Sequence, residues 1–296
     1  MPTPVNKLPF QTVSVLGSGT MGAGIAQILA QAGCTVWLYD IETRFLESGL
    51  GRIQASLDAG VAKGKFTPEA AESALKKINT TTQLDLLRDC ELIIEAVPED
   101  LALKQGLFQS LDSICPANTL FASNTSSLSI TALASATKRP QQFAGLHFFN
   151  PVPLMKLVEV IEGRQTDEST IKQLWELSLA LNKTPVRAKD TPGFIVNRVA
   201  RPYYGESFRI LSDQVGDVAM IDQILTEAGG FRMGPFTLMD LIGIDINFAV
   251  TQTVYNGYFQ EPRYRPHPIQ AQMVAAGLLG KKTGQGFYTY ENKHGK

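Results

Sequence analysis

The sequence predicts an α/β fold, a doubly wound and mostly parallel sheet that is followed by an all-helical C-terminal domain. Three observations support this prediction. The 296 residues are enough for about two domains of ~150 residues each. In the first half, short runs of β-branched residues alternate with longer helical patterns, as in parallel sheets. After Asp190 such runs almost disappear, so we place the domains at residues 1–189 and 190–296.

In the first domain, strands and helices are expected to alternate along the chain. Thr12–Leu16 is a buried strand, and the helix Gly22–Ala32 ends at Gly33. Thr35–Asp40 forms a second strand and precedes a long helix, Ile41–Ala62. Further apolar runs predict the strands Leu92–Val97, Thr119–Ser123, Gln142–Phe148 and Leu157–Ile161.

The second domain shows helix signals almost throughout. Pro192 and Gly193 are expected to open one helix, and Gly229-Gly230 to close another that covers Val218–Ala228. Only Gly286–Tyr290 has an extended pattern. We therefore expect a purely helical domain with one short extended stretch near its end.

Composition excludes several classes of partner. Hydrophobic residues make up 44% and charged residues 19%, which is typical of globular proteins. The net charge is -1, with 27 basic and 28 acidic residues, so no basic field attracts nucleic acid or an anionic membrane surface. No apolar run approaches the ~18 residues that a membrane span needs. Met1–Phe10 has three prolines and no apolar segment of a secretory signal.

The cysteine pattern indicates free thiols. Cys34, Cys90 and Cys115 are odd in number and widely spaced. This spacing fits neither a disulfide framework nor a zinc site. We expect three reduced cysteines, no metal and a cytoplasmic protein.

A glycine-rich loop follows the first strand. It has the pattern G-x-G-x-x-G of a Rossmann-type dinucleotide site and consists of Gly17, Ser18, Gly19, Thr20, Met21 and Gly22. Gly17 permits the tight turn, Gly19 lets a pyrophosphate approach the backbone, and Gly22 lets helix and strand pack closely. Free N–H groups at the start of the helix and the helix dipole then hold the phosphates. The alternative is a structural turn, but the strand before the loop and the helix after it favour cofactor binding.

Asp40 ends the second strand, 18 residues after Gly22. An acid at about 20 residues binds the ribose hydroxyls of the adenosine. Its carboxylate would repel a 2′-phosphate, so NAD is favoured over NADP. Arg44 is the only nearby opposing signal, and we expect it to face solvent.

His147 is the strongest candidate for acid–base chemistry. Of three histidines, His267 lies between prolines and His294 lies in the tail, whereas His147 ends an apolar strand. A histidine in such surroundings is often only a core residue. However, Glu159 interrupts another apolar strand, where a buried carboxylate needs a partner unless it faces water at a sheet edge. A paired histidine and glutamate predict a general base.

Two polar residues complete the candidate chemistry. Ser126 follows the strand Thr119–Ser123, where a hydroxyl can hold substrate or only cap a helix. Asn197 is expected in mid-helix, an unfavourable place for Asn unless it has a specific role. No residue resembles an activated nucleophile, so hydride transfer coupled to proton transfer is the expected chemistry.

Taken together, these motifs resemble the 3-hydroxyacyl-CoA dehydrogenase family. The resemblance covers nearly the whole chain, through the stretches Leu16–Ala26, Ser123–Ser127, Gly145–Val160, Asp190–Arg198, Met233–Pro235 and Gly280–Tyr288. Arg201–Tyr204 and Asn247–Val250 further resemble a bacterial branch that acts in phenylacetate catabolism on 3-hydroxyadipyl-CoA. Arg232 departs from the family, which has a small residue there.

The resemblance implies a role for each site residue. His147 would be the base, Glu159 would orient it, and further residues would hold the substrate oxygens, namely Ser126 and Asn197. The implied cofactor contacts beyond the glycine loop are Asp40, Glu99, Lys104, Asn150 and Lys282. Ser56 and Lys63 match positions that meet the CoA portion.

The expected function is an NAD-dependent interconversion of (3S)-3-hydroxyacyl-CoA and 3-oxoacyl-CoA. Two alternatives stay open, a non-catalytic dinucleotide-binding protein related to a lens crystallin, and an NADPH-dependent hydroxyacid or imine reductase. The resemblance and the apolar residues of the helical domain predict a homodimer. Arg201 shares a helix face with Asn197, so it could reach a substrate carboxylate, although it could also tie domains together or face solvent.

Overall fold

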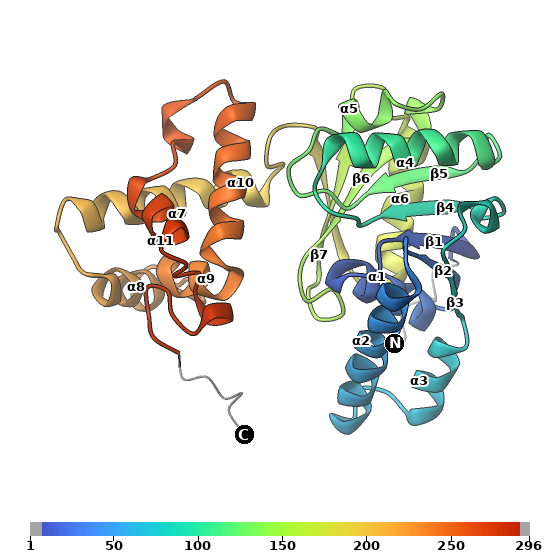
Figure 1. Ribbon diagram of the computed structural model, residues 1–296, viewed down its shortest axis with the longest axis horizontal. Coiled ribbons are helices and arrows are strands. Elements are labelled where there is room, and N and C mark those ends of the chain that lie inside the picture. The colour runs from blue at the N-terminus through green and yellow to red at the C-terminus, as the bar shows by residue number, and fades with distance from the viewer. Residues whose placement is uncertain (1–7, 291–296) are drawn as a thin grey trace. The chain divides into compact units, whose positions relative to one another are not determined.

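The computed structural model of the chain describes residues 8–290. These form two compact units, which divide between Thr191 and Pro192 (Figure 1). The division lies two residues beyond the boundary expected from the sequence. His294 and most of Met1–Phe10 lie outside the described residues, and so do the expectations made for them.

The first unit is built on one eight-stranded sheet with the order β3-β2-β1-β4-β5-β6-β7-β8. Its strands are β1 (Thr12–Leu16), β2 (Thr35–Tyr39), β3 (Ile78–Thr81), β4 (Leu92–Glu95), β5 (Leu120–Ser123), β6 (Phe143–Phe148), β7 (Leu157–Glu162) and β8 (Thr184–Lys189). Neighbouring strands run parallel, except that β6 and β7 are antiparallel. The prediction of a doubly wound, mostly parallel sheet is confirmed. The strand order reverses between β1 and β4, which is where such sheets bind nucleotides.

Helices cover both faces of this sheet. They are α1 (Thr20–Ala32), α2 (Thr43–Ala62), α3 (Pro68–Leu75), α4 (Leu101–Ile114), α5 (Ile130–Ala134) and α6 (Glu168–Ala180), with short 3-10 turns at Leu84–Leu87 and Pro140–Gln142. Helices α1, α2, α3 and α6 share one buried cluster with the residues of one sheet face. On the other face, Phe108 of α4 packs on Phe143 of β6, with ring centroids 4.6 Å apart. Burial from both sides explains why the central strands are almost continuously apolar.

The edge strands were not predicted from the sequence. Ile78–Thr81 (INTT) and Thr184–Lys189 (TPVRAK) form β3 and β8 at the two ends of the sheet. An edge strand has one neighbour and faces solvent, so it carries polar residues and even proline, here Pro185. Their patterns therefore lack the apolar run that marked the central strands.

The second unit is helical, as predicted. Its helices are α7 (Val196–Ser212), α8 (Val218–Glu227), α9 (Pro235–Ile242), α10 (Ile244–Gly257) and α11 (Pro268–Ala275), with 3-10 turns at Pro262–Tyr264 and Lys281–Thr283. Phe208 and Phe236 are buried at the centre of its core, and their rings meet edge to face at 5.6 Å. This unit therefore has a hydrophobic core of its own.

One helix start was predicted wrongly. Pro192 and Gly193 do not open a helix, since α7 begins only at Val196. Gly193 has φ +76° and Phe194 has φ +48°, a left-handed backbone that an α-helix does not contain. Asn197 consequently lies in the first turn of α7 and not in mid-helix, a position where Asn is far less unfavourable.

Two buried aspartates hold the end of the described chain. Asp222 accepts hydrogen bonds from two backbone N–H groups at the start of α9 (2.9 and 2.8 Å) and from the Tyr288 hydroxyl (2.9 Å). Asp240 accepts from the backbone N–H of Tyr288 (2.9 Å) and from the Tyr290 hydroxyl (2.9 Å). Burial and the neighbouring carboxylate raise the pKa of Tyr288 to about 12. The expected extended stretch, Gly286–Tyr290, is thus fixed by side chains and forms only an isolated bridge, not a strand.

Candidate active site

The glycine loop has the geometry that a dinucleotide requires. Gly17 has φ +91°, and a Cβ there would lie 2.7 Å from the carbonyl oxygen of Ala96. A Cβ on Gly22 would lie 1.7 Å from the carbonyl oxygen of Gly17. A Cβ on Gly19 would meet nothing within 4 Å, and α1 begins directly after it, at Thr20, with no side chain capping its N-terminus. The loop is therefore closed toward the sheet and open toward a ligand at Gly19 and Thr20.

Asp40 follows β2 and binds the same loop. Its Oδ2 accepts hydrogen bonds from the backbone N–H (2.8 Å) and the hydroxyl (2.7 Å) of Ser18. Arg44 pairs with Glu42 at 2.7 Å, and its side chain is 70% exposed. The donors to this carboxylate are Ser18 and the backbone N–H of Ile41 rather than a lysine or an arginine, which suits an acid that receives ribose hydroxyls.

His147, Glu159 and Ser126 form one hydrogen-bonded row. Nδ1 of His147 lies 2.7 Å from Oε2 of Glu159, and Nε2 lies 3.0 Å from Oγ of Ser126. His147 is 4% exposed and Glu159 is 0% exposed. Because β8 pairs with the far side of β7, Glu159 is not at a sheet edge facing water, and that alternative is excluded. The row can take a proton at Nε2 while the carboxylate stabilises the resulting positive charge.

Glu99 holds the segment that carries Ser126. Its Oε1 accepts hydrogen bonds from the hydroxyl of Thr125 and from the backbone N–H groups of Ser126 (3.0 Å) and Ser127 (3.2 Å). Burial acts to raise the pKa of Glu99, but the charge of Lys104 and these hydrogen bonds outweigh it and lower the pKa below its usual value. An ionised Glu99 therefore fixes the backbone on both sides of the Ser126 hydroxyl.

Lys104 lies beneath Glu99 and is only 1% exposed. Its Nζ is 2.8 Å from Oε1 of Glu95, 2.9 Å from Oε2 of Glu99 and 3.3 Å from the carbonyl oxygen of Val97. Three acceptors of the protein thus use the three ammonium protons. The sequence expectation of a direct cofactor contact does not agree with this burial, and Lys104 is placed to act through Glu99.

Glu95 is a residue of this network that the sequence analysis missed. Its carboxylate is fully buried and also accepts a hydrogen bond of 2.6 Å from the hydroxyl of Ser123. Burial raises its pKa, and the attraction of Lys104 offsets this only in part. The signal was present in the sequence, because Glu95 interrupts an apolar strand just as Glu159 does.

The ends of β5 and β6 are tied together next to the row. Asn124 accepts a hydrogen bond of 2.8 Å at Oδ1 from the backbone N–H of Phe148. Asn150 lies two residues further on and is exposed. Its amide is therefore accessible to a ligand at the carboxyl end of the sheet, where the implied cofactor contact would be made.

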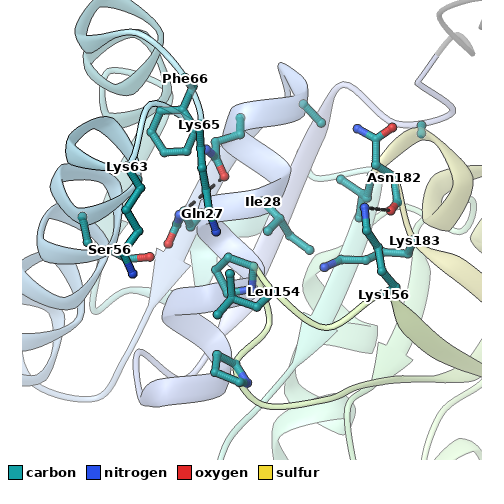
Figure 2. A pocket seen from close by; sticks show the side chains of 18 residues that line it. Gln27, Ile28, Ser56, Lys63, Lys65, Phe66, Leu154, Lys156, Asn182 and Lys183 are labelled. Carbon is teal, nitrogen blue, oxygen red and sulfur yellow. Dashed lines mark hydrogen bonds between the residues drawn. The ribbon is translucent and has the colours of Figure 1, made fainter.

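A hollow of about 460 Å³ lies between α1, α2 and the segment that follows β6 (Figure 2). Ser56 and Lys63, the two expected CoA contacts, both line it. Lys65, Lys156 and Lys183 line it too and were not predicted. Lys183 donates hydrogen bonds to two backbone carbonyl groups of the segment after β6, and burial together with Lys156 lowers its pKa to about 8. The hollow offers several ammonium groups and a hydroxyl to an anionic ligand.

Asn197 and Lys282 belong to the second unit. Lys282 makes an ion pair with Asp245 at 2.6 Å, and its side chain is 43% exposed. Arg201 is 4% exposed and donates to the backbone carbonyls of Asn197 and Asn247, both at 3.0 Å. Burial lowers its pKa to about 10. The expectation that Arg201 reaches toward a substrate is wrong, because its guanidinium supports the core of its own unit. Arg232 is exposed.

Residues 8–290 contain neither a membrane-spanning helix nor a cluster of metal ligands. Within that range no helix is both long and apolar enough to cross a bilayer. The same residues contain no group of three or more His, Cys, Asp or Glu side chains that could hold a metal ion.

Comparisons with known proteins show which family both parts of the chain match. Residues 12–191 match the 3-hydroxyacyl-CoA dehydrogenase NAD-binding domain, and residues 193–290 match the C-terminal domain of the same family. The 3-hydroxyadipyl-CoA dehydrogenase of Escherichia coli K12 is 50% identical over 280 residues, which are 95% of this chain and 59% of that protein. The chain thus spans less than two thirds of that relative. A probable 3-hydroxybutyryl-CoA dehydrogenase of Deinococcus radiodurans is 44% identical over 93% of this chain and 99% of its own length.

Solved structures give the same result. The structure of (S)-3-hydroxybutyryl-CoA dehydrogenase from Ralstonia eutropha superposes with a TM-score of 0.92 at 41% identity and covers 96% of this chain and 100% of its own. A 3-hydroxybutyryl-CoA dehydrogenase structure from Escherichia coli K12 has a TM-score of 0.93 at 49% identity and covers 97% of this chain and 61% of its own.

Proposed function

The chain belongs to the 3-hydroxyacyl-CoA dehydrogenase family, and from this premise we propose that it is an NAD-dependent oxidoreductase that interconverts (3S)-3-hydroxyacyl-CoA and 3-oxoacyl-CoA. The observation that carries the proposal is the buried row of Ser126, His147 and Glu159. It lies at the carboxyl end of β5 and on the neighbouring strands β6 and β7, in the same sheet as the glycine loop.

The residues divide the chemistry as follows. His147 accepts the proton of the substrate 3-hydroxyl at Nε2, while Ser126 donates a hydrogen bond to the same oxygen. Glu159 holds Nδ1 at 2.7 Å and stabilises the charged imidazole. A positioned base contributes about 10²–10⁴-fold to the rate. The glycine loop, with its open face at Gly19, would hold the pyrophosphate of NAD, and the bound cofactor would supply the hydride acceptor for C3. Asn197 is proposed as a second ligand of the substrate oxygen.

Four residues beyond the glycine loop are proposed to contact NAD. Asp40 is proposed to bind the adenosine ribose, and Glu99, which accepts a hydrogen bond from the backbone N–H of Ser126, and the exposed Asn150 are proposed as further contacts. Lys282 is proposed from the second unit. Lys104 acts only through Glu99, because it is buried beneath that carboxylate.

The lysine-lined hollow is proposed to bind the phosphates of CoA. Ser56 and Lys63 lie there with exposed ammonium groups nearby, and polyphosphate is the anionic part of the substrate. A Lys63→Ala variant should raise KM for acetoacetyl-CoA about tenfold and leave the Kd of NADH unchanged. The control is Lys76→Ala, which removes an exposed lysine that pairs with Glu72 and does not line the hollow. An unchanged KM in Lys63→Ala would reject this assignment.

One assay tests the function against both alternatives. We expect absorbance at 340 nm to fall when acetoacetyl-CoA and NADH are added, and to fall far more slowly with NADPH. A protein that binds NADH but oxidises none would be a non-catalytic dinucleotide-binding protein. Faster turnover with NADPH would indicate the hydroxyacid or imine reductase, which usually has a lysine where this chain has Asn197.

The substrate is proposed to include 3-hydroxyadipyl-CoA. The support is the name of the Escherichia coli relative at 50% identity and the resemblance to the phenylacetate branch. Since Arg201 is buried in its own unit, a terminal carboxylate needs another partner, and the exposed Arg232 is proposed for that role.

A homodimer through the helical unit is proposed as the assembly. Ile195, Val199 and Phe231 are 42%, 69% and 50% exposed and line an apolar groove of about 480 Å³. Single exposed apolar residues are normal on a protein surface, but a contiguous apolar groove is typical of an interaction site. Light scattering at micromolar concentration should give twice the chain mass, and a monomer would reject the proposal.

A cytoplasmic location is proposed from the thiols. Cys34, Cys90 and Cys115 are buried and unpaired with one another, and burial raises their pKa values to about 11, 12 and 11. Free thiols are typical of a reducing compartment.

A further inference from the structure

Asp190 caps the start of α5 from a distant part of the chain. Its carboxylate accepts hydrogen bonds from the hydroxyl of Ser129 (2.8 Å) and from the backbone N–H groups of Ile130 (3.0 Å) and Thr131 (2.8 Å). First-turn N–H groups have no acceptor inside their own helix. One side chain therefore satisfies two of these donors and also fixes the N-cap serine.

The same residue lies where the chain leaves the sheet. Strand β8 ends at Lys189, and the backbone N–H of Asp190 donates to the carbonyl oxygen of Glu162 at 3.0 Å. Thr191 is the last residue of the first unit. Asp190 thus has its backbone fixed to β7 and its carboxylate fixed to α5, immediately before the linker.

Helix α5 continues the segment that carries Ser126. Glu99 fixes this segment at Ser126 and Ser127, and Ile130 is fully buried four residues after Ser126. Asp190 supplies the second anchor, at the other end of the segment. The Ser126 hydroxyl lies 3.0 Å from His147, a distance that depends on how firmly both ends are held.

We propose that Asp190 is a positioning residue of the active site, which fixes the Ser126 segment to the point where the chain departs toward the helix that bears Asn197. Asp190 lies seven residues before Asn197. Its side chain therefore connects the segment that carries Ser126 with the start of the chain that leads to Asn197. The expected effect on catalysis rests on the proposed function. The effect on the Ser126–His147 contact does not.

The test compares Asp190→Ala with a matched loss of a helix cap elsewhere. Asp217 caps α8 by accepting a hydrogen bond of 2.8 Å from the backbone N–H of Met220, far along the chain from the row. Asp217→Ala should lower Tm by about 2–4 °C, as expected for the loss of one cap. Asp190→Ala should lower Tm by a similar or larger amount.

The two variants should differ in catalysis. Asp190→Ala should lower kcat with acetoacetyl-CoA at least tenfold and leave the Kd of NADH within twofold, because the glycine loop lies on other strands. Asp217→Ala should keep kcat within twofold. Equal kcat in the two variants, measured at equal distance below their Tm, would overturn the proposal.

A second readout does not depend on activity. The chain has three histidines, so a spectrum of the protein labelled with 15N-histidine contains few signals, and His147→Gln identifies that of His147. Asp190→Ala should shift the Nε2 signal of His147, whereas Asp217→Ala should not. Asp190→Asn, which keeps the size and one acceptor oxygen, should give an intermediate shift and covers the case in which the alanine variant does not fold.

An Nε2 signal that is unchanged in Asp190→Asn and in Asp190→Ala would overturn the positioning role. If wild-type protein shows no dehydrogenase activity, the proposed function fails, and the spectra still decide the role of Asp190.

Discussion

Glu159 faces His147 directly across the one antiparallel strand pair among the eight strands described, and their side chains meet at 2.7 Å. Residues directly opposite in such a pair have Cβ atoms about 4.5–5.5 Å apart. At this Cβ separation the carboxylate and the imidazole reach each other directly, and few other rotamers of either side chain keep the contact. The backbone register of β6 and β7 therefore sets the orientation of the proposed base.

His147→Gln should fold and bind NADH but lose nearly all turnover. Glutamine keeps the approximate size and can still hydrogen-bond Glu159, but it cannot act as a base near neutral pH. We expect kcat to fall by about 10²–10⁴-fold, measured as NADH oxidation with acetoacetyl-CoA. A variant that retains more than about a tenth of wild-type kcat would show that His147 is not the general base.

Lys104→Met should make the protein sensitive to acid. The folded-state pKa of Glu99 is lowered, although burial opposes this, because of Lys104 and the hydrogen bonds around it. This stabilisation is present above the unfolded-state pKa of about 4.3 and is lost as the pH falls through the folded-state value. Without Lys104 the folded-state pKa of Glu99 rises, so the midpoint of acid unfolding should move to higher pH.

The acid unfolding of Lys104→Met should be followed by near-UV circular dichroism from pH 7 to pH 2. Breaking the buried pair with Glu95 should also lower the free energy of unfolding at pH 7 by about 3–5 kcal/mol. Lys76→Met removes the exposed partner of Glu72, whose side chain is 66% exposed, and should change neither value noticeably. Coincident acid transitions for the two variants and wild type would contradict the role given to Lys104.

Asp40→Asn should weaken the preference for NADH over NADPH. The substitution removes the negative charge that repels a 2′-phosphate, and the amide can keep one hydrogen bond to Ser18. We expect the ratio of kcat/KM for the two cofactors to fall at least tenfold. Glu42→Gln removes a nearby exposed charge that pairs with Arg44 and should leave the ratio within twofold. No change in Asp40→Asn would mean that the acid does not select the cofactor.

Arg201→Met should lower stability without changing substrate preference. The buried guanidinium donates to backbone carbonyls of α7 and α10 and to the Thr251 hydroxyl inside the helical unit, so its replacement removes these charge-assisted hydrogen bonds, at a cost of about 1–3 kcal/mol. We expect a lower Tm and an unchanged ratio of kcat/KM for 3-hydroxyadipyl-CoA over 3-hydroxyhexanoyl-CoA.

Arg232→Met is the counterpart of that variant. Arg232 is exposed, so its removal should lower the ratio for the dicarboxylic substrate and leave Tm nearly unchanged. A wild type without preference for the dicarboxylic substrate would end the idea of a terminal carboxylate.

The strands that could be predicted from the sequence are those that are buried on both faces of the sheet. The central strands and the glycine loop carry their own local signals, and the pairing of His147 with Glu159 followed from two polar residues in apolar strands. The edge strands β3 and β8 gave no such signal, because one edge of each strand faces solvent and polar residues are tolerated there.

Contacts between distant segments were beyond local patterns. Nothing near Asp190 in the sequence indicates that its carboxylate binds the start of α5, some 60 residues earlier. Arg201 was read from helix periodicity alone, which gives the face of a helix but not what that face packs against. Glu95 could have been found, since the reasoning applied to Glu159 fits it equally well.

The hold of Asp222 and Asp240 on Tyr288 and Tyr290 has a consequence for the order in which the chain folds during synthesis. The first unit has all its strands once Thr191 has emerged from the ribosome. The helical unit lacks the partners of its two buried carboxylates until residue 290 follows. At 5–20 residues per second, those roughly 100 residues take about 5–20 s. During that interval the sheet can already fold, and a nascent chain should bind the dinucleotide before it can turn over any substrate.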